Sequence, residues 1–190
     1  MSRSPAPDVL DKISVPPTRS PRSARARELI AAARTLLEAE GPDALTMRRL
    51  GDQLGMRAPS IYKHFADKAA LESALIEEAL AEIGAALHDA LAKRARRNPV
   101  ACVLDTYRRF SVGQPNMYRL ATSGRLDRAA LPVGLEDWAG EPFLLATGDP
   151  HRAQALWSFA HGMVILEIDG RFPDGSDLDR TWRAGTDVFA

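Results

Sequence analysis

The chain has 190 residues, of which 45% are hydrophobic, and its 25 Lys and Arg residues balance its 25 Asp and Glu residues. This length suffices for one sizeable hydrophobic core or two small ones. The single cysteine, Cys102, excludes an intrachain disulfide, and no apolar run reaches the length of a membrane-spanning helix. Because the N-terminus also lacks the apolar core of a signal peptide, we expect a cytoplasmic protein.

The charges are distributed unevenly along the chain. Residues 1–68 contain 12 Lys or Arg and 8 Asp or Glu, a net charge of +4, whereas residues 69–190 contain 13 and 17, a net charge of −4. A basic N-terminal part followed by an acidic remainder favours one orientation of approach to a polyanion such as DNA.

The first 22 residues combine five prolines with several Ser and Arg, a composition that predicts a disordered tail. Arg19, Arg22, Arg25 and Arg27 lie just before or within the first turns of the first expected helix. These arginines either form an arm that reaches phosphates or the minor groove, or belong to a solvated tail that DNA attracts diffusely.

The segment from Arg25 to Glu40 has the periodicity of an amphipathic helix. Its apolar stripe contains Leu29, Ile30, Ala33, Leu36 and Leu37. Gly41 and Pro42 follow directly and predict the end of this helix.

Residues 46–65, TMRRLGDQLGMRAPSIYKHF, predict two short helices joined by a tight turn. Thr46 is a good N-cap for the first helix, because its hydroxyl can accept from an unpaired helix N–H. The apolar positions of this helix, spaced to form one buried face, are Met47, Leu50 and Leu54. Gly55 follows, where a tight turn requires a positive φ.

The second helix of this pair is expected to begin near Pro59, which has no N–H to lose in a first helical turn. One side of the helix is formed by Ala58, Ile61, Tyr62 and Phe65. The outer side, which can donate to phosphates or base edges, is formed by Arg57, Ser60, Lys63 and His64. Proteins use this arrangement to insert a helix into the major groove of DNA, although a small helical hairpin with a solvated basic face would show the same pattern.

A long helix is then expected from Asp67, its N-cap, to Leu91. Its apolar stripe contains Leu71, Leu75, Leu80, Ile83, Leu87 and Leu91. The N-terminal part therefore consists of three helices, with a long fourth helix leaving them.

The run from Ser23 to about Gly84 resembles the DNA-binding domain of the TetR family of transcriptional repressors. The matching motifs are AAARTLLEAEG, LTMRRLGDQLGM, IYKHF and DKAALESAL. The resemblance implies an all-helical homodimer that binds a palindromic operator in double-stranded DNA. In the family, Arg57 stands where a small hydroxyl residue often caps the helix, so this chain exchanges that cap for a long donor at the groove.

The residues that we expect to contact DNA come from this helical pair and its flanks. They are Thr46, Arg48, Arg57, Ala58, Pro59, Ser60, Tyr62, Lys63, His64 and Lys68. By the resemblance, Tyr62, His64 and Lys68 hold backbone phosphates, while Arg48, Arg57, Ala58, Pro59, Ser60 and Lys63 read or approach bases.

Each of these assignments has a simpler alternative. The ring of Tyr62 could belong to the core, and His64 and Lys68 could be ordinary surface residues. The guanidinium groups of Arg48 and Arg57 fit O6 and N7 of guanine, but arginines on a basic face more often contact phosphate.

The remainder of the chain predicts a helical body. Helices are expected over residues 100–112 and 116–122, and a short one near Glu141–Ala146 within an irregular stretch from Ser123 to Asp149. We therefore predict an all-α protein with a tail of residues 1–22, a DNA-binding helix-turn-helix head of residues 23–84, and a body of residues 85–190.

The segment from His151 to Asp169 predicts a helix that is apolar on two sides, so that both sides must be covered. One side can pack on the chain's own core and the other on a second subunit, or the helix can be central to a monomer. The residues expected at a dimer interface are Trp157, Ala160, Val164, Ile168, Leu178 and Trp182. An interface with the same surface on both subunits fits a two-fold symmetric operator.

The run WSFAHGMVILEIDGRF, from Trp157 to Phe172, resembles a C-terminal domain of one TetR subgroup, which is marked by Trp157, His161 and Gly162. The family resemblance also implies an effector pocket in the body. Its expected lining is Tyr107, Phe110, Tyr118, Trp138, Phe143, Trp157 and His161. Aromatic residues at helical spacing also form ordinary cores, and the absence of a basic run favours a largely apolar effector.

Other classes of protein fit the sequence less well. The four histidines never occur as HxxxH or HExxH, and the chain has no Gly-rich phosphate loop and no GxSxG motif, so we expect neither an enzyme nor a bound metal or cofactor. The alternatives left are a DNA-binding helical dimer without ligand control and a helical adaptor that uses its basic face for another purpose. The operator, the regulated genes, the effector and the direction of regulation do not follow from these patterns.

Overall fold

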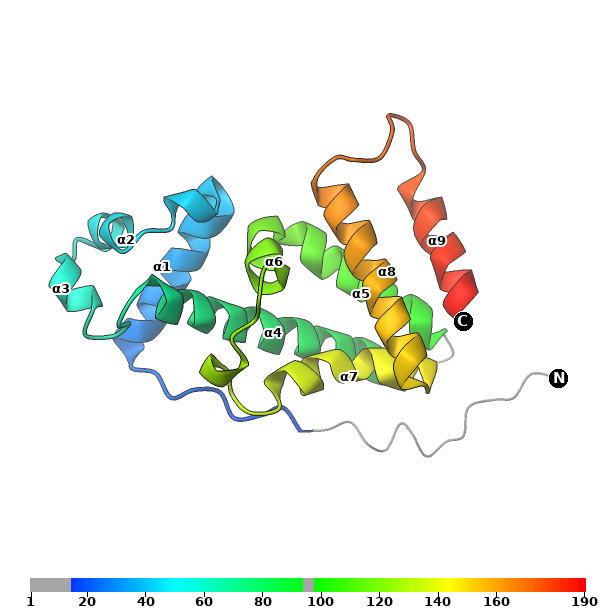
Figure 1. The fold of residues 1–190 in the computed structure, drawn as a ribbon, viewed down its shortest axis with the longest axis horizontal. Coiled ribbons are helices and arrows are strands. Elements are labelled where there is room, and N and C mark those ends of the chain that lie inside the picture. The colour runs from blue at the N-terminus through cyan, green and yellow to red at the C-terminus, as the bar shows by residue number, and fades with distance from the viewer. Residues whose placement is uncertain (1–14, 94–97) are drawn as a thin grey trace. The chain divides into compact units, whose positions relative to one another are not determined.

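The computed structural model describes residues 15–93 and 98–190, and every regular element in these ranges is helical (Figure 1), which confirms the expected all-α class. The chain divides into two compact units. The head unit contains Pro17–Ala81 and Gln114–Leu135, and the body unit contains Glu82–Gly113 and Glu136–Ala190. Most of the predicted disordered tail, residues 1–14, lies outside the described residues.

The head unit contains three helices that lie together in Figure 1, followed by the long helix that the sequence predicts. Its elements are α1 (Ala24–Glu40), η2 (Pro42–Ala44), α2 (Met47–Leu54), α3 (Ala58–Ile61), the first part of α4 (Lys68–Lys93), α6 (Pro115–Thr122) and η3 (Arg128–Ala130). Helix α1 begins where the Ser23 hydroxyl accepts from the backbone N–H of Ala26 at 3.1 Å, and ends at Gly41 with a φ of 82°.

The core of the head unit is almost entirely aliphatic. Side chains that are at most 1% exposed come from all four N-terminal helices and α6: Leu29, Ile30, Leu37, Leu50, Ile61, Leu71, Leu75 and Met117. Complete burial of one such side chain contributes about 1.5–3 kcal/mol, so this core fixes the short helices α2 and α3, which are too short to be stable alone.

Helix α6 packs on α1, which the sequence does not indicate. The Glu38 carboxylate accepts from the backbone N–H of Met117 at 2.6 Å and from that of Asn116 at 3.4 Å, at the N-terminus of α6. An acidic group is favourable there because the first N–H groups of a helix lack internal partners. The head unit therefore contains residues 114–135, which the sequence places in the body, and α4 passes from one unit to the other between Ala81 and Glu82.

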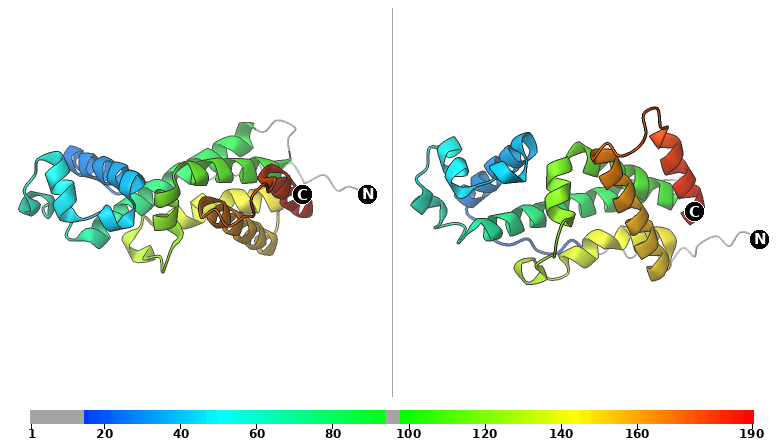
Figure 2. Two further views of the ribbon diagram at one scale, coloured as in Figure 1. Left: turned by 90° about the horizontal axis from the view of Figure 1, so that it is seen from above. Right: turned by 45° about the horizontal axis from the view of Figure 1, so that its top comes forward.

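The body unit contains the rest of α4 with α5 (Pro99–Gly113), α7 (Leu135–Thr147), α8 (Pro150–Ile168) and α9 (Leu178–Phe189). Helix α9 lies beside α8 in both views of Figure 2. One stripe of α8 is buried: Ala153, Leu156, Ala160, Met163 and Val164. A Cβ atom at Gly185 would overlap the ring of Phe159, so glycine permits this close approach of α9 to α8.

Helix α7 differs from the prediction of a short helix near Glu141–Ala146, because it already begins at Leu135 and keeps Pro142 in its interior. Proline has no N–H to donate to the carbonyl four residues earlier, which here belongs to Trp138. The ring nitrogen Nε2 of His88 lies 3.1 Å from that carbonyl oxygen and takes the place of the missing donor. None of the described helices is long and apolar enough to cross a membrane.

Candidate nucleic-acid interface

The turn between α2 and α3 is fixed by backbone contacts. Thr46 caps α2 as predicted, its hydroxyl accepting from the Arg49 N–H at 3.2 Å, and α2 ends at Gly55 in the left-handed region with a φ of 61°. The N–H of Met56 donates to the carbonyl of Gly51 at 2.8 Å. A Cβ atom at Gly51 would lie only 2.8 Å from the Met56 carbonyl oxygen, so the close approach of Met56 to α2 requires glycine at this position.

Helix α3 is shorter than the predicted helix, which reached Phe65, because regular α-helix ends at Ile61. The chain continues as hydrogen-bonded turns, with the N–H groups of His64 and Phe65 both donating to the Ile61 carbonyl, at 2.8 and 3.1 Å. Ile61 is fully buried and Phe65 is 6% exposed. These two side chains anchor the segment, so its other side chains face outward.

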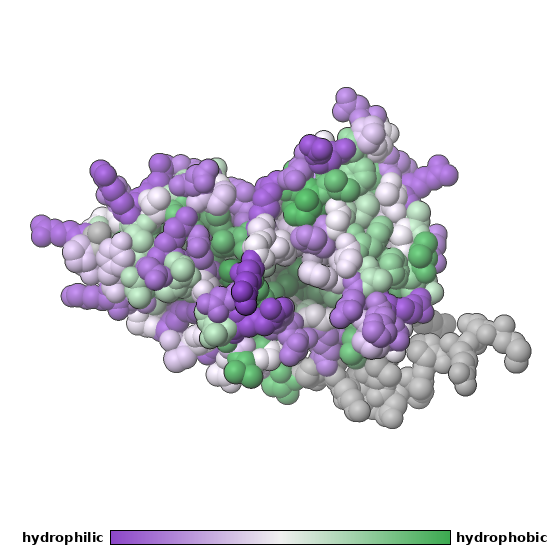
Figure 3. All heavy atoms as spheres, viewed as in Figure 1, coloured by the Kyte–Doolittle hydropathy of each residue, from purple (hydrophilic) through white to green (hydrophobic). Residues whose placement is uncertain are grey.

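The structure places most predicted DNA-contacting residues on one continuous stretch of surface from α2 to the start of α4. Arg48, Arg57, Pro59, Tyr62 and Lys63 are exposed, as is the cap residue Thr46, while Ser60, His64 and Lys68 are half-buried; of Ala58 only the backbone is described. Tyr62 is 50% exposed, which argues against the alternative that its ring belongs to the core. Hydrophilic residues dominate the surface around α2 and α3 in Figure 3.

Three cations of this surface have no intramolecular counterion. Within residues 15–93 and 98–190, Arg48, Arg57 and Lys63 form no ion pair, whereas the neighbouring Arg49 pairs with Glu40. Lys68 lies 3.4 Å from the Glu72 carboxylate, one helical turn further along α4. Unpaired cations on an outward surface are suited to phosphates and base edges.

The half-buried His64 is oriented by α1. Its Nδ1 atom lies 3.4 Å from the hydroxyl of Ser23, the N-cap residue of α1. The other ring nitrogen, Nε2, has no hydrogen-bond partner in the described part of the chain and is free to donate to a phosphate.

The segment before α1 is fastened to α4 by a buried carboxylate. Glu77, 1% exposed, accepts from the Ser20 N–H at 2.8 Å and from the Arg22 guanidinium at 2.5 Å. Burial raises the pKa of Glu77, but the hydrogen bonds from Arg22 and Ser20 outweigh it, and the net pKa lies below the usual range. The sequence allowed a free arm that contains Arg22 and Arg25. Instead, Arg22 is paired with Glu77, and Arg25 pairs with Glu28. Glu77 escaped prediction because the adjacent pair Glu77 and Glu78 resembles the solvated side of a helix.

Six of the predicted effector residues belong to the body unit, and the seventh, Tyr118, belongs to the head unit. Tyr107 of α5 and Phe143 of α7 are buried in edge-to-face contact at 5.4 Å, and Trp138 is 7% exposed. Trp157 and His161 stack at 5.7 Å on α8, where burial lowers the pKa of His161. Phe110 is half-buried on α5, and Tyr118 belongs to the head unit rather than to the body.

The sequence prediction also missed His88, which is 5% exposed on α4. Its ring stacks on that of Trp138 at a centroid distance of 4.9 Å. Trp138 in turn covers Gly84, where a Cβ atom would lie 2.5 Å from the indole ring. Together these residues hold α7 against α4 inside the body unit.

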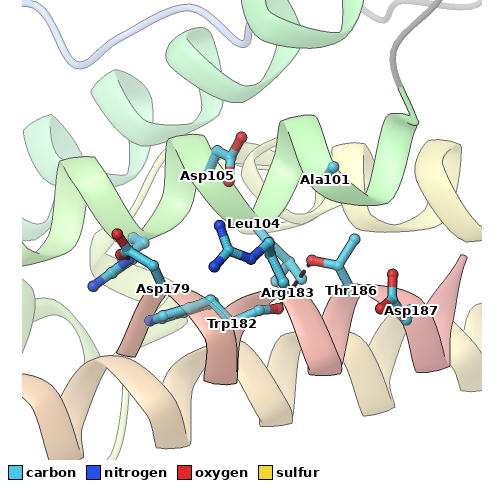
Figure 4. A pocket seen from close by; sticks show the side chains of 9 residues that line it. Ala101, Leu104, Asp105, Asp179, Trp182, Arg183, Thr186 and Asp187 are labelled. Carbon is cyan, nitrogen blue, oxygen red and sulfur yellow. Dashed lines mark hydrogen bonds and ion pairs between the residues drawn. The ribbon is translucent and has the colours of Figure 1, made fainter. Parts of the chain in front are cut away.

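A groove of about 540 Å³ lies between α5 and α9 (Figure 4). Its lining contains Ala101, Leu104, Asp105, Arg108, Asp179, Trp182, Arg183, Thr186 and Asp187. Arg108 is held by the Glu167 carboxylate at 2.8 Å and that of Asp179 at 2.5 Å, and these contacts raise its pKa against the effect of burial. The mixture of fixed charges does not match the largely apolar effector that the sequence favours.

The predicted dimer residues separate into two groups. Ala160 and Val164 are fully buried and Trp182 is 5% exposed within their own unit, so the expectation that they face a second subunit requires correction. Leu178 and Ile168 are half-buried, and Trp157 is 46% exposed. Leu166, which the sequence analysis did not assign, is 41% exposed on the same helix. Apolar side chains reach the surface around α8 and α9 in Figure 3.

No group of three or more His, Cys, Asp or Glu side chains that could hold a metal ion occurs among the residues that the structure describes. Buried Cys102 is a free thiol in α5. The chemistry available is therefore that of an outward cationic surface on the head unit and an aromatic core in the body unit.

Comparison with known proteins agrees with this geometry. Residues 29–75 match the sequence model of the bacterial regulatory proteins of the tetR family. The chain is 28% identical over 162 residues to the uncharacterized HTH-type transcriptional regulator Rv0681 of Mycobacterium tuberculosis, covering 77% of this chain and 71% of that protein. It is 36% identical over 106 residues to tetracycline repressor protein class A from transposon 1721 of Escherichia coli, covering 56% of this chain and 44% of that protein.

Among solved structures, a TetR variant from Acinetobacter baumannii AYE, in complex with minocycline, matches with a TM-score of 0.60 and 27% identity, covering 85% of this chain and 91% of that chain. These comparisons support a TetR-family regulator with a DNA-binding head and a helical body. The homologues are transcriptional regulators and not enzymes, in agreement with the prediction from the sequence.

Proposed function

We propose that this chain is a sequence-specific transcriptional repressor that binds a palindromic operator as a homodimer and is released from it by a small-molecule effector. The observation that carries the proposal is the outward surface of α2, α3 and the following turn, where Arg48, Arg57 and Lys63 have no counterion among the described residues. The family match over residues 29–75 supports the same role for this surface.

The proposed roles of the DNA-contacting residues follow from their chemistry. Arg48 and Arg57 reach guanine O6 and N7 or a neighbouring phosphate, because a guanidinium can donate two parallel hydrogen bonds. Tyr62, His64 and Lys68 hold backbone phosphates and set the register of α3 in the groove. The small or half-buried residues of α3 and the cap residue lie closest to the bases: Thr46, Ala58, Pro59 and Ser60.

The proposed dimer uses the exposed apolar side chains of α8. Trp157 and Leu166 are large and apolar yet 46% and 41% exposed, which makes them candidates for burial against a second subunit. A two-fold axis through this surface gives each subunit the same contacts and presents two α3 segments to two half-sites. The subgroup assignment of the C-terminal region remains part of this proposal.

The proposed effector binds in the body unit. The minocycline complex of the Acinetobacter protein supports a small-molecule site in this fold, without identifying the ligand of this chain. Helix α4 contributes to both units, so a ligand that prefers one arrangement of the body alters the head through that helix. An effector shifts the equilibrium only by its difference in affinity for the two arrangements. We also propose a cytoplasmic location.

Selection of bound sequences from a random duplex pool, at near-physiological salt, tests the proposal. We expect a palindromic motif with half-sites about one helical turn, roughly 34 Å, apart. The double variant Arg57→Ala/Lys63→Ala should lose the motif, whereas Arg180→Ala, which removes an exposed cation from α9, should retain it. Folded dimer that yields no motif would favour non-specific DNA binding or an adaptor role instead.

The dimer is tested separately by Leu166→Glu, which places a charge on the exposed apolar surface of α8. We expect this variant to sediment as a monomer and to lose affinity for the two-half-site operator. The matched control is Val133→Glu, because Val133 is 96% exposed on another segment and should remain dimeric. If Leu166→Glu is as dimeric as the wild type, α8 is not the interface.

A further inference from the structure

The environment of His88 fixes which of its ring nitrogens carries the proton. On the Nε2 side lie two oxygen acceptors, the Trp138 carbonyl at 3.1 Å and the Glu141 carboxylate at 3.6 Å. The carbonyl has lost its helical donor because Pro142 stands four residues later in α7. Two acceptors facing one nitrogen require that Nε2 carries a hydrogen and donates it.

The other nitrogen, Nδ1, is consequently an acceptor with a free lone pair. It belongs to a ring that is 5% exposed and stacked on an indole. Nδ1 has no hydrogen-bond partner among the described residues. Native proteins rarely leave a buried polar atom unpaired, and such an atom marks a place for a water molecule or a ligand.

A second buried atom of the body unit shares this property. The hydroxyl of Ser111, fully buried on α5, also has no partner among the residues described, and Ser111 stands one helical turn from Tyr107. A serine hydroxyl inside a helix ordinarily bonds to the carbonyl four residues earlier. Both unpaired atoms belong to the unit that carries the buried aromatic residues, whereas the described part of the head unit contains none.

The surroundings of His88 define the chemistry of a ligand that Nδ1 accepts. Trp138, 7% exposed, covers one face of the ring, and Gly84 leaves only backbone beside that indole. Burial at this depth disfavours a charged ligand, and the Glu141 carboxylate disfavours an anion in particular. An acceptor beside a buried indole is matched by a hydroxyl or N–H group on an uncharged ring or chain.

We propose that His88 Nδ1 accepts a hydrogen bond from the effector, which is an uncharged, largely apolar compound carrying at least one hydroxyl or N–H donor. This inference rests on the proposed effector control. A ligand bound to His88 acts directly on α4, since His88 is part of the helix that both units share. Such a ligand also displaces the packing of Trp138 on Gly84, which fixes the spacing of α7 and α4.

The first test needs no ligand. In the ¹⁵N-resolved imidazole spectrum of the full-length protein at about pH 8, where a histidine of ordinary pKa is neutral, the His88 resonances are assigned by their loss in His88→Phe, with His151, an exposed histidine, as internal reference. We expect hydrogen on Nε2 and the chemical shift of an unbonded acceptor at Nδ1. Hydrogen on Nδ1, or an Nδ1 shift showing that a buried water already occupies it, would overturn the proposal. If His88→Phe does not fold, selectively labelled His88→Gln provides the assignment.

The second test uses phenol and anisole, which share the ring and its oxygen atom, but only phenol donates a hydrogen bond because anisole has a methyl group in place of the hydroxyl hydrogen. We expect phenol to move the His88 Nδ1 resonance and to bind about tenfold more tightly than anisole, as one buried hydrogen bond provides. His88→Phe should bind both equally. Equal binding of the two compounds to the wild type, or binding of neither, overturns the proposal.

Operator binding, measured in parallel, distinguishes this inference from the proposed function. A normal operator motif together with an unresponsive His88 would refute the site and leave the regulator assignment intact. A phenol-responsive His88 with operator affinity reduced by phenol supports both. A phenol-responsive His88 in a protein that selects no operator would support the site but overturn its role as an effector site.

Discussion

Glu77 and His88 are ionisable side chains buried on the same helix, α4, but in different units, and their partners differ. In the head unit, the Glu77 carboxylate is bonded by the guanidinium of Arg22 and the N–H of Ser20. In the body unit, Nε2 of His88 lies 3.1 Å from the Trp138 carbonyl, and Nδ1 has no hydrogen-bond partner among the described residues. One unit satisfies its buried charge completely, and the other keeps an open acceptor in its core.

Under the proposed function, the difference corresponds to two requirements, one of DNA binding and one of ligand control. A reading surface must hold its geometry, and the bonded Glu77 fastens the segment before α1 to α4 without leaving a polar atom unpaired. A ligand-binding core must instead have a polar group that the ligand completes, since an unpaired acceptor is the one that gains most from a new donor. The same helix can serve both purposes because its two parts belong to different units.

Arg22→Ala should have the largest effect on this comparison, because it leaves the buried Glu77 carboxylate without its counterion. We expect the free energy of unfolding at neutral pH to fall by about 3–5 kcal/mol, measured by urea denaturation. Arg19→Ala is the matched control, since Arg19 is exposed in the same segment and should cost less than about 0.5 kcal/mol. A loss for Arg22→Ala as small as that of the control would show that Glu77 is not a buried, paired charge.

Glu77→Gln should lower the free energy of unfolding by a smaller amount, and this amount should depend on pH. The folded-state pKa of Glu77 lies below its ordinary value of 4.5, so its contribution is fully present above that value and is lost as the pH falls through the folded pKa. At neutral pH the hydrogen bonds to the charged group contribute about 2 kcal/mol. The difference between wild type and Glu77→Gln should therefore be constant from neutral pH down to the ordinary value and decline below 4.5.

The control for this titration is Glu28→Gln, because Glu28 forms an exposed pair with Arg25 and should change the free energy of unfolding little at any pH. A difference for Glu77→Gln that grows on acidification would have the wrong sign and would contradict the pairing.

A double-mutant cycle tests whether His88 takes the place of the backbone N–H that Pro142 lacks. His88→Phe keeps an aromatic ring beside Trp138 but removes the Nε2 contact to the Trp138 carbonyl, which should lower the free energy of unfolding by about 1–2 kcal/mol. In a Pro142→Ala background, the new N–H can bond to that carbonyl, so His88→Phe should cost much less. An equal cost of His88→Phe in both backgrounds would show that His88 does not replace the donor.

Ser23→Gly should have the smallest effect and act on DNA binding rather than stability. Glycine is a tolerable N-cap, costing roughly 0.3 kcal/mol, but it removes the hydroxyl 3.4 Å from His64 Nδ1. We expect operator affinity to fall about threefold, because His64 loses the contact that orients it. Ser23→Thr keeps the hydroxyl and should restore the affinity. Equal affinities for both variants would show that Ser23 does not orient His64 for binding.

The helices of the head were predictable because their signals are local. Met47 and Leu50 are buried as the spacing indicated, Thr46 caps α2, and Gly55 has the positive φ that the turn required. The length of α3 was not predictable, because Tyr62 fits the apolar side of a continued helix equally well. Its exposure results from the turn after Ile61, which depends on tertiary contacts.

In the body, the sequence could not tell which neighbour covers each side of a helix. Ala160 and Val164 lie on the side of α8 that packs within its own unit, whereas a count of apolar positions assigned them to a partner. Only a short helix near Glu141–Ala146 was expected, yet α7 runs from Leu135 through Pro142, where His88, from a distant part of the chain, lies 3.1 Å from the carbonyl that lacks its helical donor. Glu77 and His88 show the same limit, since a buried polar residue looks like a surface residue until its partners are known.

We propose that the surface from α2 to the start of α4 reads DNA while the body does not touch it. Backbone hydrogen exchange, compared with and without the duplex selected from the random pool, tests this claim residue by residue. We expect DNA to slow exchange within residues 46–68 and to leave exchange in α5, α8 and α9 unchanged. Protection that results from dimerisation should be the same with and without DNA. Slowed exchange confined to α8 and α9, with residues 46–68 unaffected, would contradict it.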